Sequence, residues 1–314
     1  MHSAMIKRIL DYRLHFNKIG SLLVTTAKNW YNRDPFRESS IIAYNAIFSL
    51  PGLLVVVFTL TGYFFDAEVL SGRLHTQIAK AMGTETADQI QAIIVQGYKS
   101  KDSWFATAVA LVTIFIGATG VFVQMQISLN NIWEVKATVV KSGIWEYLKT
   151  RLFSFGLIIT VAFLLLISLV LSSLLAALGN WFIQRFSETF VVFFHVLNFV
   201  FSLIVITVLF VLMFKILPDA KIKWHLVWIG AFVTALLFVL GKTALGFYFG
   251  KANPGAGYGA AGSIILIMLW TSYTSMIVFF GAEFTKVYAD TYYGEVPASD
   301  NAVKVETHEV EVVK

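Results

Sequence analysis

Two charged residues lie inside long apolar runs of the sequence, Lys242 in one run and Glu283 near the end of the next. A charge at that depth costs several kcal/mol unless it is paired, hydrated or extended to the membrane surface. Lys242 lies about 18 residues, or roughly 27 Å of helix, beyond Trp224, where its run begins. Its ammonium group can either bind an anionic headgroup or extend outward to water. The carboxylate of Glu283 can either bind a proton or a cation, or form an ion pair that joins two helix ends.

Amide side chains form a second set of candidates, because they gather near one end of the first two apolar runs, the end assigned below to the cytoplasm. These amides are Asn45, Gln124, Gln126 and Asn130. They can line a cavity open to the cytoplasm together with Arg37, Glu38, Glu134 and Glu283. Hydrogen bonds between helices, each worth about 0.6–2 kcal/mol, explain the same amides without a cavity.

Basic residues near the inner surface are the expected ion-pair partners of the Glu283 carboxylate. They are Arg37, Lys215 and Lys286. The candidate residues for binding a substrate or an ion are therefore Lys242, Glu283, Asn45, Gln124, Gln126, Asn130 and Arg37.

Enzyme chemistry has no recognisable residue pattern in this sequence. The six histidines have no metal-ligand spacing, and there is no G-x-x-x-x-G-K-[ST] phosphate loop and no G-x-S-x-G nucleophile turn. Cysteine is absent, which excludes thiolate catalysis and cysteine metal sites. A basic and aromatic module for RNA is also missing. We therefore predict no enzyme activity, no catalytic residue, no metal, no cofactor and no nucleic-acid partner.

The composition indicates that the helices positioning these residues lie in lipid. Of 314 residues, 57% are hydrophobic and only 14% are charged, whereas a soluble protein carries about a quarter charged residues. We predict a one-domain, all-α integral membrane protein with six transmembrane helices. The predicted spans are residues 41–65, 104–129, 152–178, 190–217, 224–249 and 258–287.

Segments outside the spans complete the predicted organisation. Residues 1–40 form a cytoplasmic amphipathic segment, whose residues 5–33 make one or two helices that lie on the membrane surface or pack against the bundle. Asp34-Pro35 is typical of a helix start, and Pro51 predicts a kink in the first span. Within the 41–289 transmembrane domain, residues 66–103 form a helical insertion on the outer side. Residues 290–314 are acidic and poor in large apolar residues, which predicts a disordered cytoplasmic tail.

Lysine and arginine placement predicts the orientation, because cytoplasmic loops carry an excess of both. Seven basic residues precede the first span, at positions 7, 8, 13, 18, 28, 33 and 37. Basic residues also cluster between spans two and three and between spans four and five. The alternate loops contain one basic residue each or, in the long first loop, basic residues diluted by acidic ones. Both termini are therefore predicted to lie in the cytoplasm.

Several motifs follow one another along the apolar runs. They read AYNAIFSLP at residues 43–51, SLNNIW at 128–133, LPD at 217–219, GA at 230–231, YGAAG at 258–262 and GAE at 281–283. In this order they resemble the BrkB/YihY family of bacterial inner-membrane proteins, from about residue 20 to about residue 290. The resemblance implies a multi-pass protein of the inner (plasma) membrane. Relatives have also carried the name ribonuclease BN, which this chain contradicts because it lacks a metal site or general base.

The glycine-rich link over residues 250–262 joins the last two spans into a hairpin. It either permits close helix packing or forms irregular backbone that lines a cavity.

Transport is the leading functional hypothesis. A transporter or flippase of an amphipathic, anionic envelope molecule, such as a lipid precursor, would use Lys242 as the headgroup contact and Glu283 as a proton or cation site. An ion gradient or the substrate's own gradient would drive it, since no nucleotide motif exists. The main alternative is a non-transporting envelope scaffold or assembly factor, in which neutralising either residue changes stability and not activity. Membrane lipids are the expected partners in both cases.

Overall fold

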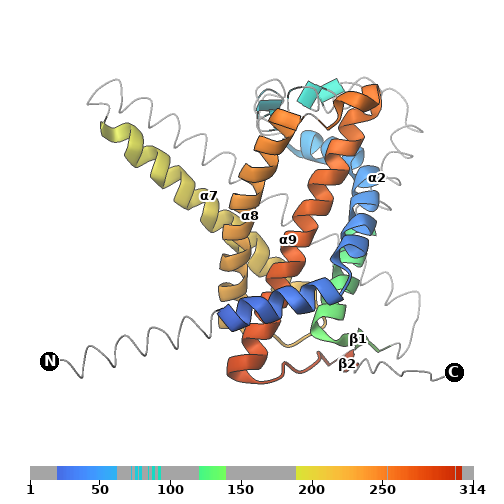
Figure 1. Cartoon of the computed structure of the whole chain (residues 1–314), viewed down its shortest axis with the longest axis vertical. Coiled ribbons are helices and arrows are strands. Elements are labelled where there is room, and N and C mark those ends of the chain that lie inside the picture. The colour runs from blue at the N-terminus through green and yellow to red at the C-terminus, as the bar shows by residue number, and fades with distance from the viewer. Residues whose placement is uncertain are drawn as a thin grey trace.

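The structure is a computed structural model that describes residues 20–61, 120–138, 189–252, 254–300 and 302–305, with scattered residues between 72 and 92. Its labelled elements are α2 (Pro35–Thr61), β1 (Val135–Ala137), α7 (Thr189–Ile216), α8 (Trp224–Ala252), η2 (Ala256–Ala261), α9 (Gly262–Tyr293) and β2 (Ala302–Lys304). Residues 20–32, here called the transverse helix, and residues 120–133 are also helical. The described part of the chain is therefore mostly helical (Figure 1).

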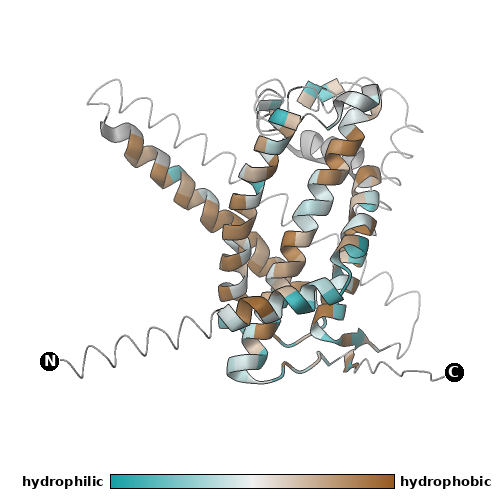
Figure 2. Ribbon diagram, viewed as in Figure 1, coloured by the Kyte–Doolittle hydropathy of each residue, from teal (hydrophilic) through white to brown (hydrophobic). Residues whose placement is uncertain are grey.

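Three of the described helices are long and apolar enough to cross a membrane: Val192–Ile216, Trp224–Ala252 and Gly262–Tyr293. They match the last three predicted spans, because long apolar runs without a breaker leave few alternatives to a spanning helix. α7 is apolar over most of its length (Figure 2) and exposes Val192, Phe193 and Ile204, as expected of a helix surrounded by hydrocarbon. The third predicted span and most of the second lie outside the described residues, so the number of six spans stays a prediction.

α2 covers most of the predicted first span and begins at Pro35, as the sequence predicted. Proline suits the first helical position because its missing N–H would have no partner there. The Asp34 carbonyl accepts the first helical hydrogen bond from the Glu38 N–H at 3.3 Å. The helix continues through Pro51 to Thr61 without ending. In the predicted outer insertion, the scattered described residues are helical, and the remainder of that segment lies outside the described residues.

α8 and α9 form the predicted antiparallel hairpin and pack through two reciprocal glycine–threonine contacts. Thr285 covers Gly230, and Thr234 covers Gly281, so closely that a Cβ on either glycine would overlap the facing threonine hydroxyl. Each hydroxyl donates to the glycine carbonyl four residues earlier on its own helix, Thr234 to Gly230 at 2.6 Å and Thr285 to Gly281 at 2.7 Å. The threonines thus satisfy their hydroxyls locally while the glycines allow the two backbones to approach.

The link between the two helices also brings backbone against backbone. A Cβ on Gly262 would lie 2.5 Å from the Gly255 carbonyl oxygen, and one on Gly255 would lie 3.1 Å from the Gly262 carbonyl oxygen. This contact supports the packing interpretation of the glycine-rich link.

The transverse helix lies across the C-terminal half of α9 (Figure 1), at the end that the sequence predicts to face the cytoplasm and that we call the inner end. Leu22 and Thr26 are buried, and the Trp30 indole N–H donates to the Met276 carbonyl at 3.2 Å. The Trp30 ring also contacts Phe280 edge-on, with 6.0 Å between ring centroids. One side of this helix therefore packs against α9.

The prediction of a disordered tail from residue 290 is wrong for the residues up to 305. α9 continues to Tyr293, and residues 294–300 and 302–305, here called the strap, pair with segments far away in the chain. β2 pairs antiparallel with β1, and Ala298 forms a β-bridge with Ala220 in the loop before α8. Val296 is buried. The strap is ordered by backbone hydrogen bonds to segments far away in the chain, which its acidic composition does not reveal.

Candidate functional site

Four charged side chains meet where the transverse helix turns into α2, and we call them the inner cluster: Arg33, Glu134, Glu283 and Lys286. Arg33 donates from Nε to Glu283 Oε2 at 3.0 Å and from Nη2 to Glu134 Oε1 at 2.8 Å. Lys286, one turn after Glu283 on α9, pairs with the same oxygen of Glu134 at 2.6 Å. Two positive charges therefore balance two negative charges, and the cluster joins α9 to the turns after the transverse helix and after helix 120–133.

An unusual backbone conformation occurs at the two turns that carry Arg33 and Glu134. Asp34, next to Arg33, has φ 53°, and Glu134 has φ 54°. Both are non-glycine residues in the left-handed region, a conformation that is uncommon and that persists where the surroundings enforce it. The Arg33 guanidinium also donates from Nη1 to the Asn131 carbonyl at 2.6 Å, near the end of helix 120–133. The chain reversals at Asp34 and Glu134 thus hold Arg33 and Glu134 facing each other.

Glu283 is the most buried member of the inner cluster, with a side chain that is 0% exposed. Among the described residues its Oε1 has no hydrogen-bond partner, although Asn29 lies close to the carboxylate. A buried carboxylate with one unbonded oxygen depends strongly on its single ion pair, because desolvation disfavours the charged form. Among the described residues Arg33 is its ion-pair partner, and the Lys286 charge and the Asn29 side chain also act on the carboxylate.

Glu134 lies after helix 120–133 and is partly exposed. Burial acts to raise the pKa of its carboxyl, but the hydrogen bonds and charges of Lys286 and Arg33 outweigh burial and lower that pKa below its ordinary value of 4.5. Glu134 is therefore held as a carboxylate that neutralises both cations.

Glu38 is the centre of a second polar group. Its Oε2 accepts hydrogen bonds from Gln124 Nε2 at 2.8 Å and from Ser128 Oγ at 2.7 Å. Its Oε1 pairs with Arg37 at 3.2 Å. These bonds join α2 to helix 120–133, and the Ser39 hydroxyl adds a 2.9 Å bond to Ser272 on α9. Both carboxylate oxygens of Glu38 are thus engaged.

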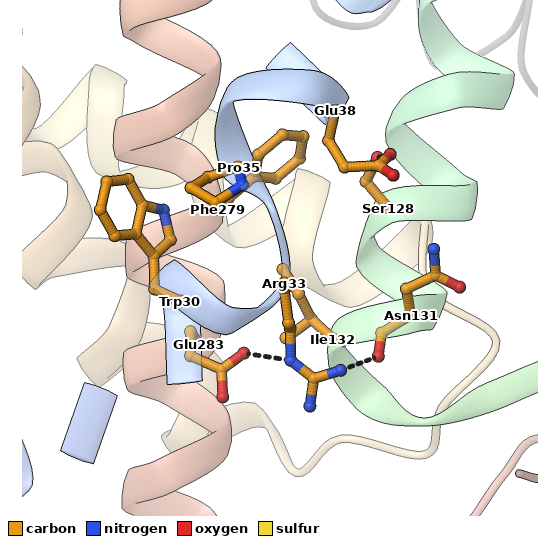
Figure 3. Close-up of a pocket in the computed structure, with 9 residues that line it drawn as sticks. All are labelled: Trp30, Arg33, Pro35, Glu38, Ser128, Asn131, Ile132, Phe279 and Glu283. Atoms are coloured by element: carbon orange, nitrogen blue, oxygen red, sulfur yellow. Dashed lines mark hydrogen bonds and ion pairs between the residues drawn. The ribbon is translucent and has the colours of Figure 1, made fainter. Parts of the chain in front are cut away.

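A pocket of about 30 Å³ lies between the inner cluster and the polar group around Glu38. Figure 3 shows the Glu38 and Glu283 carboxylates on opposite sides of it. Its lining is made of Trp30, Arg33, Pro35, Glu38, Ser128, Asn131, Ile132, Phe279 and Glu283. This volume holds about two water molecules, since one water needs about 10–15 Å³ on this measure. The pocket itself is therefore too small for anything of lipid size.

A third polar group joins two of the sequence motifs. The Asp219 N–H donates to Asn130 Oδ1, and Asn130 Nδ2 donates back to Asp219 Oδ2, both at 2.8 Å. Gln126 Nε2 donates to the same carboxylate oxygen at 3.2 Å. The LPD motif before α8 is thereby fixed against the SLNNIW motif of helix 120–133.

Two interpretations of the amides were open, a shared cavity or hydrogen bonds between helices, and the described residues show hydrogen bonds between segments. Asn130 and Gln126 bind Asp219, whereas Gln124 belongs to the Glu38 group, so the amides divide between two sites. Asn45 donates to the Ile41 carbonyl at 3.0 Å and lies against Gly120, where it serves helix packing. The amides point to different partners because they lie on different faces of their helices.

The ion-pair partner of Glu283 also differs from the three that the sequence predicted. Arg37 is 67% exposed and pairs with Asp34 and Glu38, and Lys215 donates to the Ile222 carbonyl. Lys286 lies nearby but pairs with Glu134. The partner is Arg33, whose one signal in the sequence is its place directly before the Asp34-Pro35 helix start.

Lys242 is exposed on α8. The residues that the structure describes offer it no ion pair or hydrogen bond, and its predicted role in binding stays a prediction.

The sequence of this chain matches a known protein family. Residues 26–306 match the family described as "Virulence factor BrkB". A UPF0761 membrane protein of Pseudoalteromonas atlantica is 25% identical over 253 residues, which cover 78% of each chain. A UPF0761 membrane protein of Tolumonas auensis is 24% identical over 258 residues, covering 82% of this chain and 81% of the relative. No solved structure matches the chain.

One relative has an enzyme-like name. It is the ribonuclease-like protein YfkH of Bacillus subtilis, 23% identical over 251 residues that cover 78% of this chain and 87% of the relative. Within the described residues no group of three histidine, aspartate or glutamate side chains is arranged to hold a metal. All three polar groups lie inside the matched region, and the chain belongs to the BrkB family of membrane proteins.

Proposed function

We propose that this chain is a multi-pass protein of the bacterial inner membrane, with six spans and both termini in the cytoplasm, that transports or flips an amphipathic, anionic envelope molecule such as a lipid precursor. The observation that carries the proposal is the small pocket at the inner end, which is lined by the Glu38 and Glu283 carboxylates and the Arg33 guanidinium, with Glu283 fully buried. Ionisable residues at membrane depth are costly and mark the paths of substrates and ions.

The inner cluster acts in this proposal as a gate. The pocket holds only about two waters, so passage of a headgroup requires Arg33 to leave Glu283. Separating a buried pair costs about 3–5 kcal/mol when one charge is left without a partner. A proton or a cation bound by Glu283 would offset this cost, which couples opening to an ion gradient. Lys242, exposed on a predicted span, would receive the anionic headgroup from the opposite leaflet.

Reconstitution tests the proposal. The purified full-length protein is placed in liposomes containing a fluorescent anionic phospholipid, with and without a proton gradient, and movement between leaflets is followed by chemical bleaching of the outer leaflet. Faster movement is expected with protein and gradient, and Glu283→Gln and Lys242→Ala should slow it. Glu295→Gln, on an exposed residue of the strap, and Lys251→Ala, at the outer end of α8, are the matched controls. Absence of lipid movement under any gradient would reject transport.

A scaffold or assembly factor is the second candidate function, and the bonding at the inner end favours it. Arg33 holds Glu283, both Glu38 oxygens are bonded, and Asn130 and Asp219 bind reciprocally. Such groups also serve to join helix ends. For this function Glu283→Gln should lower the thermal stability, while any envelope phenotype of a deletion strain remains fully complemented.

A further inference from the structure

The transverse helix has three distinct faces when its residues are placed at about 100° per residue. The face toward α9 carries buried or half-buried residues: Leu22, Thr26, Asn29 and Arg33. The second face is apolar or aromatic and exposed: Leu23, Val24, Ala27 and Tyr31. The third face is polar and exposed: Ser21, Thr25, Lys28 and Asn32. A helix that met only water and α9 would have no reason to separate its exposed residues in this way.

The apolar face is large for a helix of this length. Val24 is 69% exposed, Tyr31 is 68% exposed and Leu23 is 43% exposed. Lys28, a member of the polar face, lies nearest to it. A helix with packed, apolar and polar sides fits the edge of a membrane bundle, where protein, hydrocarbon and water meet.

The position of the helix agrees with that boundary. It crosses α9 transversely, near the inner end of α8 (Figure 1). Trp30 contacts Met276 and Phe280, one to two turns before Glu283 and Lys286, where α9 becomes charged. Tryptophan and tyrosine favour the depth at which headgroups meet hydrocarbon.

We propose that the transverse helix is an interfacial anchor that binds the anionic surface of the inner leaflet. Val24, Leu23 and Tyr31 insert among the lipids, and Lys28 faces the phosphates. Charge complementarity selects an anionic lipid surface as the partner, because residues 1–33 contain one acidic residue, Asp11. The basic residues of the same segment are Lys7, Arg8, Arg13, Lys18, Lys28 and Arg33.

The anchor has a direct connection to the inner cluster. Arg33 follows the transverse helix immediately and supplies the ion pair of Glu283. The depth of the helix in the leaflet therefore sets the position of the guanidinium, in a transporter and in a scaffold alike. The anchor can therefore be tested independently of the transport proposal.

The absence of cysteine allows a clean test, since every introduced thiol is unique. Full-length single-cysteine variants Val24→Cys, Tyr31→Cys, Thr25→Cys and Asn32→Cys are labelled with a fluorophore and placed in vesicles of phosphatidylethanolamine and phosphatidylglycerol. Quenching by nitroxide-labelled lipid is compared with quenching by aqueous iodide. Val24→Cys and Tyr31→Cys should favour the lipid quencher over iodide by about threefold or more, and Thr25→Cys and Asn32→Cys should show the reverse.

Two outcomes would overturn the anchor. Equal iodide quenching at all four positions would place the helix in water, and protection of Val24→Cys and Tyr31→Cys from both quenchers would show that a protein covers this face. Replacing phosphatidylglycerol with phosphatidylcholine tests the charge preference. Lipid quenching at Val24→Cys should fall, and Lys28→Gln should lessen that difference. No dependence on lipid charge would refute the anionic partner.

Discussion

Arg33 is the single residue on which the inner cluster depends most, because it bonds Glu283, Glu134 and the Asn131 carbonyl at once. Arg33→Ala would leave the fully buried Glu283 without its ion pair. We expect this change to lower the free energy of unfolding by about 3–5 kcal/mol, as for other broken buried pairs. Denaturation of the purified protein in detergent measures the effect.

The matched control for this prediction is Arg37→Ala, four residues along the chain. Arg37 is 67% exposed, so its ion pairs are screened by water and its removal should cost less than about 1 kcal/mol. A double change, Arg33→Leu with Glu283→Leu, should recover most of the loss because no unpaired buried charge remains, Lys286 being paired with Glu134. Equal effects of Arg33→Ala and Arg37→Ala would contradict the assigned importance of the inner cluster.

Glu134 gives the inner cluster a defined pH dependence. Its pKa is lower in the folded protein than the ordinary value of 4.5, because Lys286 and Arg33 outweigh burial. The ionised form thus stabilises the fold above about pH 4.5, and this contribution is lost as pH falls through the folded-state pKa. Glu134→Gln should therefore lose less stability than the parent protein between about pH 6 and pH 3.5. Equal losses in the parent protein, Glu134→Gln and the exposed control Glu295→Gln would argue against this assignment.

At the scale of elements, the α8–α9 hairpin depends on its glycine–threonine contacts. Gly230→Ala would place a Cβ against the Thr285 hydroxyl and 2.8 Å from the Thr285 Cβ. We expect a loss of about 1–3 kcal/mol or more in the free energy of unfolding, as for overpacked cores. Gly250→Ala on the same helix is the control, since its Cβ would meet nothing within 4 Å and alanine favours the helix. A neutral Gly230→Ala would show that the two helices are not held at this distance.

The strap is an element whose pairing can be locked covalently. Lys136 of β1 lies opposite Val303 of β2. The double variant Lys136→Cys with Val303→Cys should form a disulfide on mild oxidation, because directly opposed strand residues bring their Cβ atoms within about 4.5–5.5 Å. Lys136→Cys with Val305→Cys is offset by two residues and should cross-link far less. Gel mobility with and without reductant measures the bond, and similar cross-linking of both pairs would contradict the register.

The long apolar helices could be predicted from the sequence, whereas the strap could not. The predicted spans 190–217, 224–249 and 258–287 lie close to α7, α8 and α9, because apolar length depends on the local sequence alone. The strap was missed because β1 and β2 are three-residue strands whose pairing partner is far away in the chain. Composition carries no signal for such a contact.

At the scale of the whole molecule, the inner end brings together segments from most of the described chain. The inner cluster, the Glu38 group and the Asn130–Asp219 pair connect the transverse helix, α2, helix 120–133, the loop before α8 and α9. Most of the polar residues in these groups could be predicted from the sequence, because charges and amides are rare in apolar surroundings. Their pairing could not be predicted, because Arg33 and Glu283 are 250 residues apart and nothing local links them. The small pocket between the inner cluster and the Glu38 group is the central feature of the inner end.

Alkylation of Ser128→Cys tests that feature most directly. Ser128 lines the pocket and is 3% exposed, and a membrane-impermeant maleimide on the cytoplasmic side of vesicles reports whether the inner end opens. A gate predicts slow reaction at rest and about tenfold or faster reaction with anionic lipid and a proton gradient, since population of an open state scales the rate. Adding Arg33→Ala should give fast reaction without either. Equally slow reaction in all three conditions would contradict the gate and leave the inner cluster as a permanent structural joint.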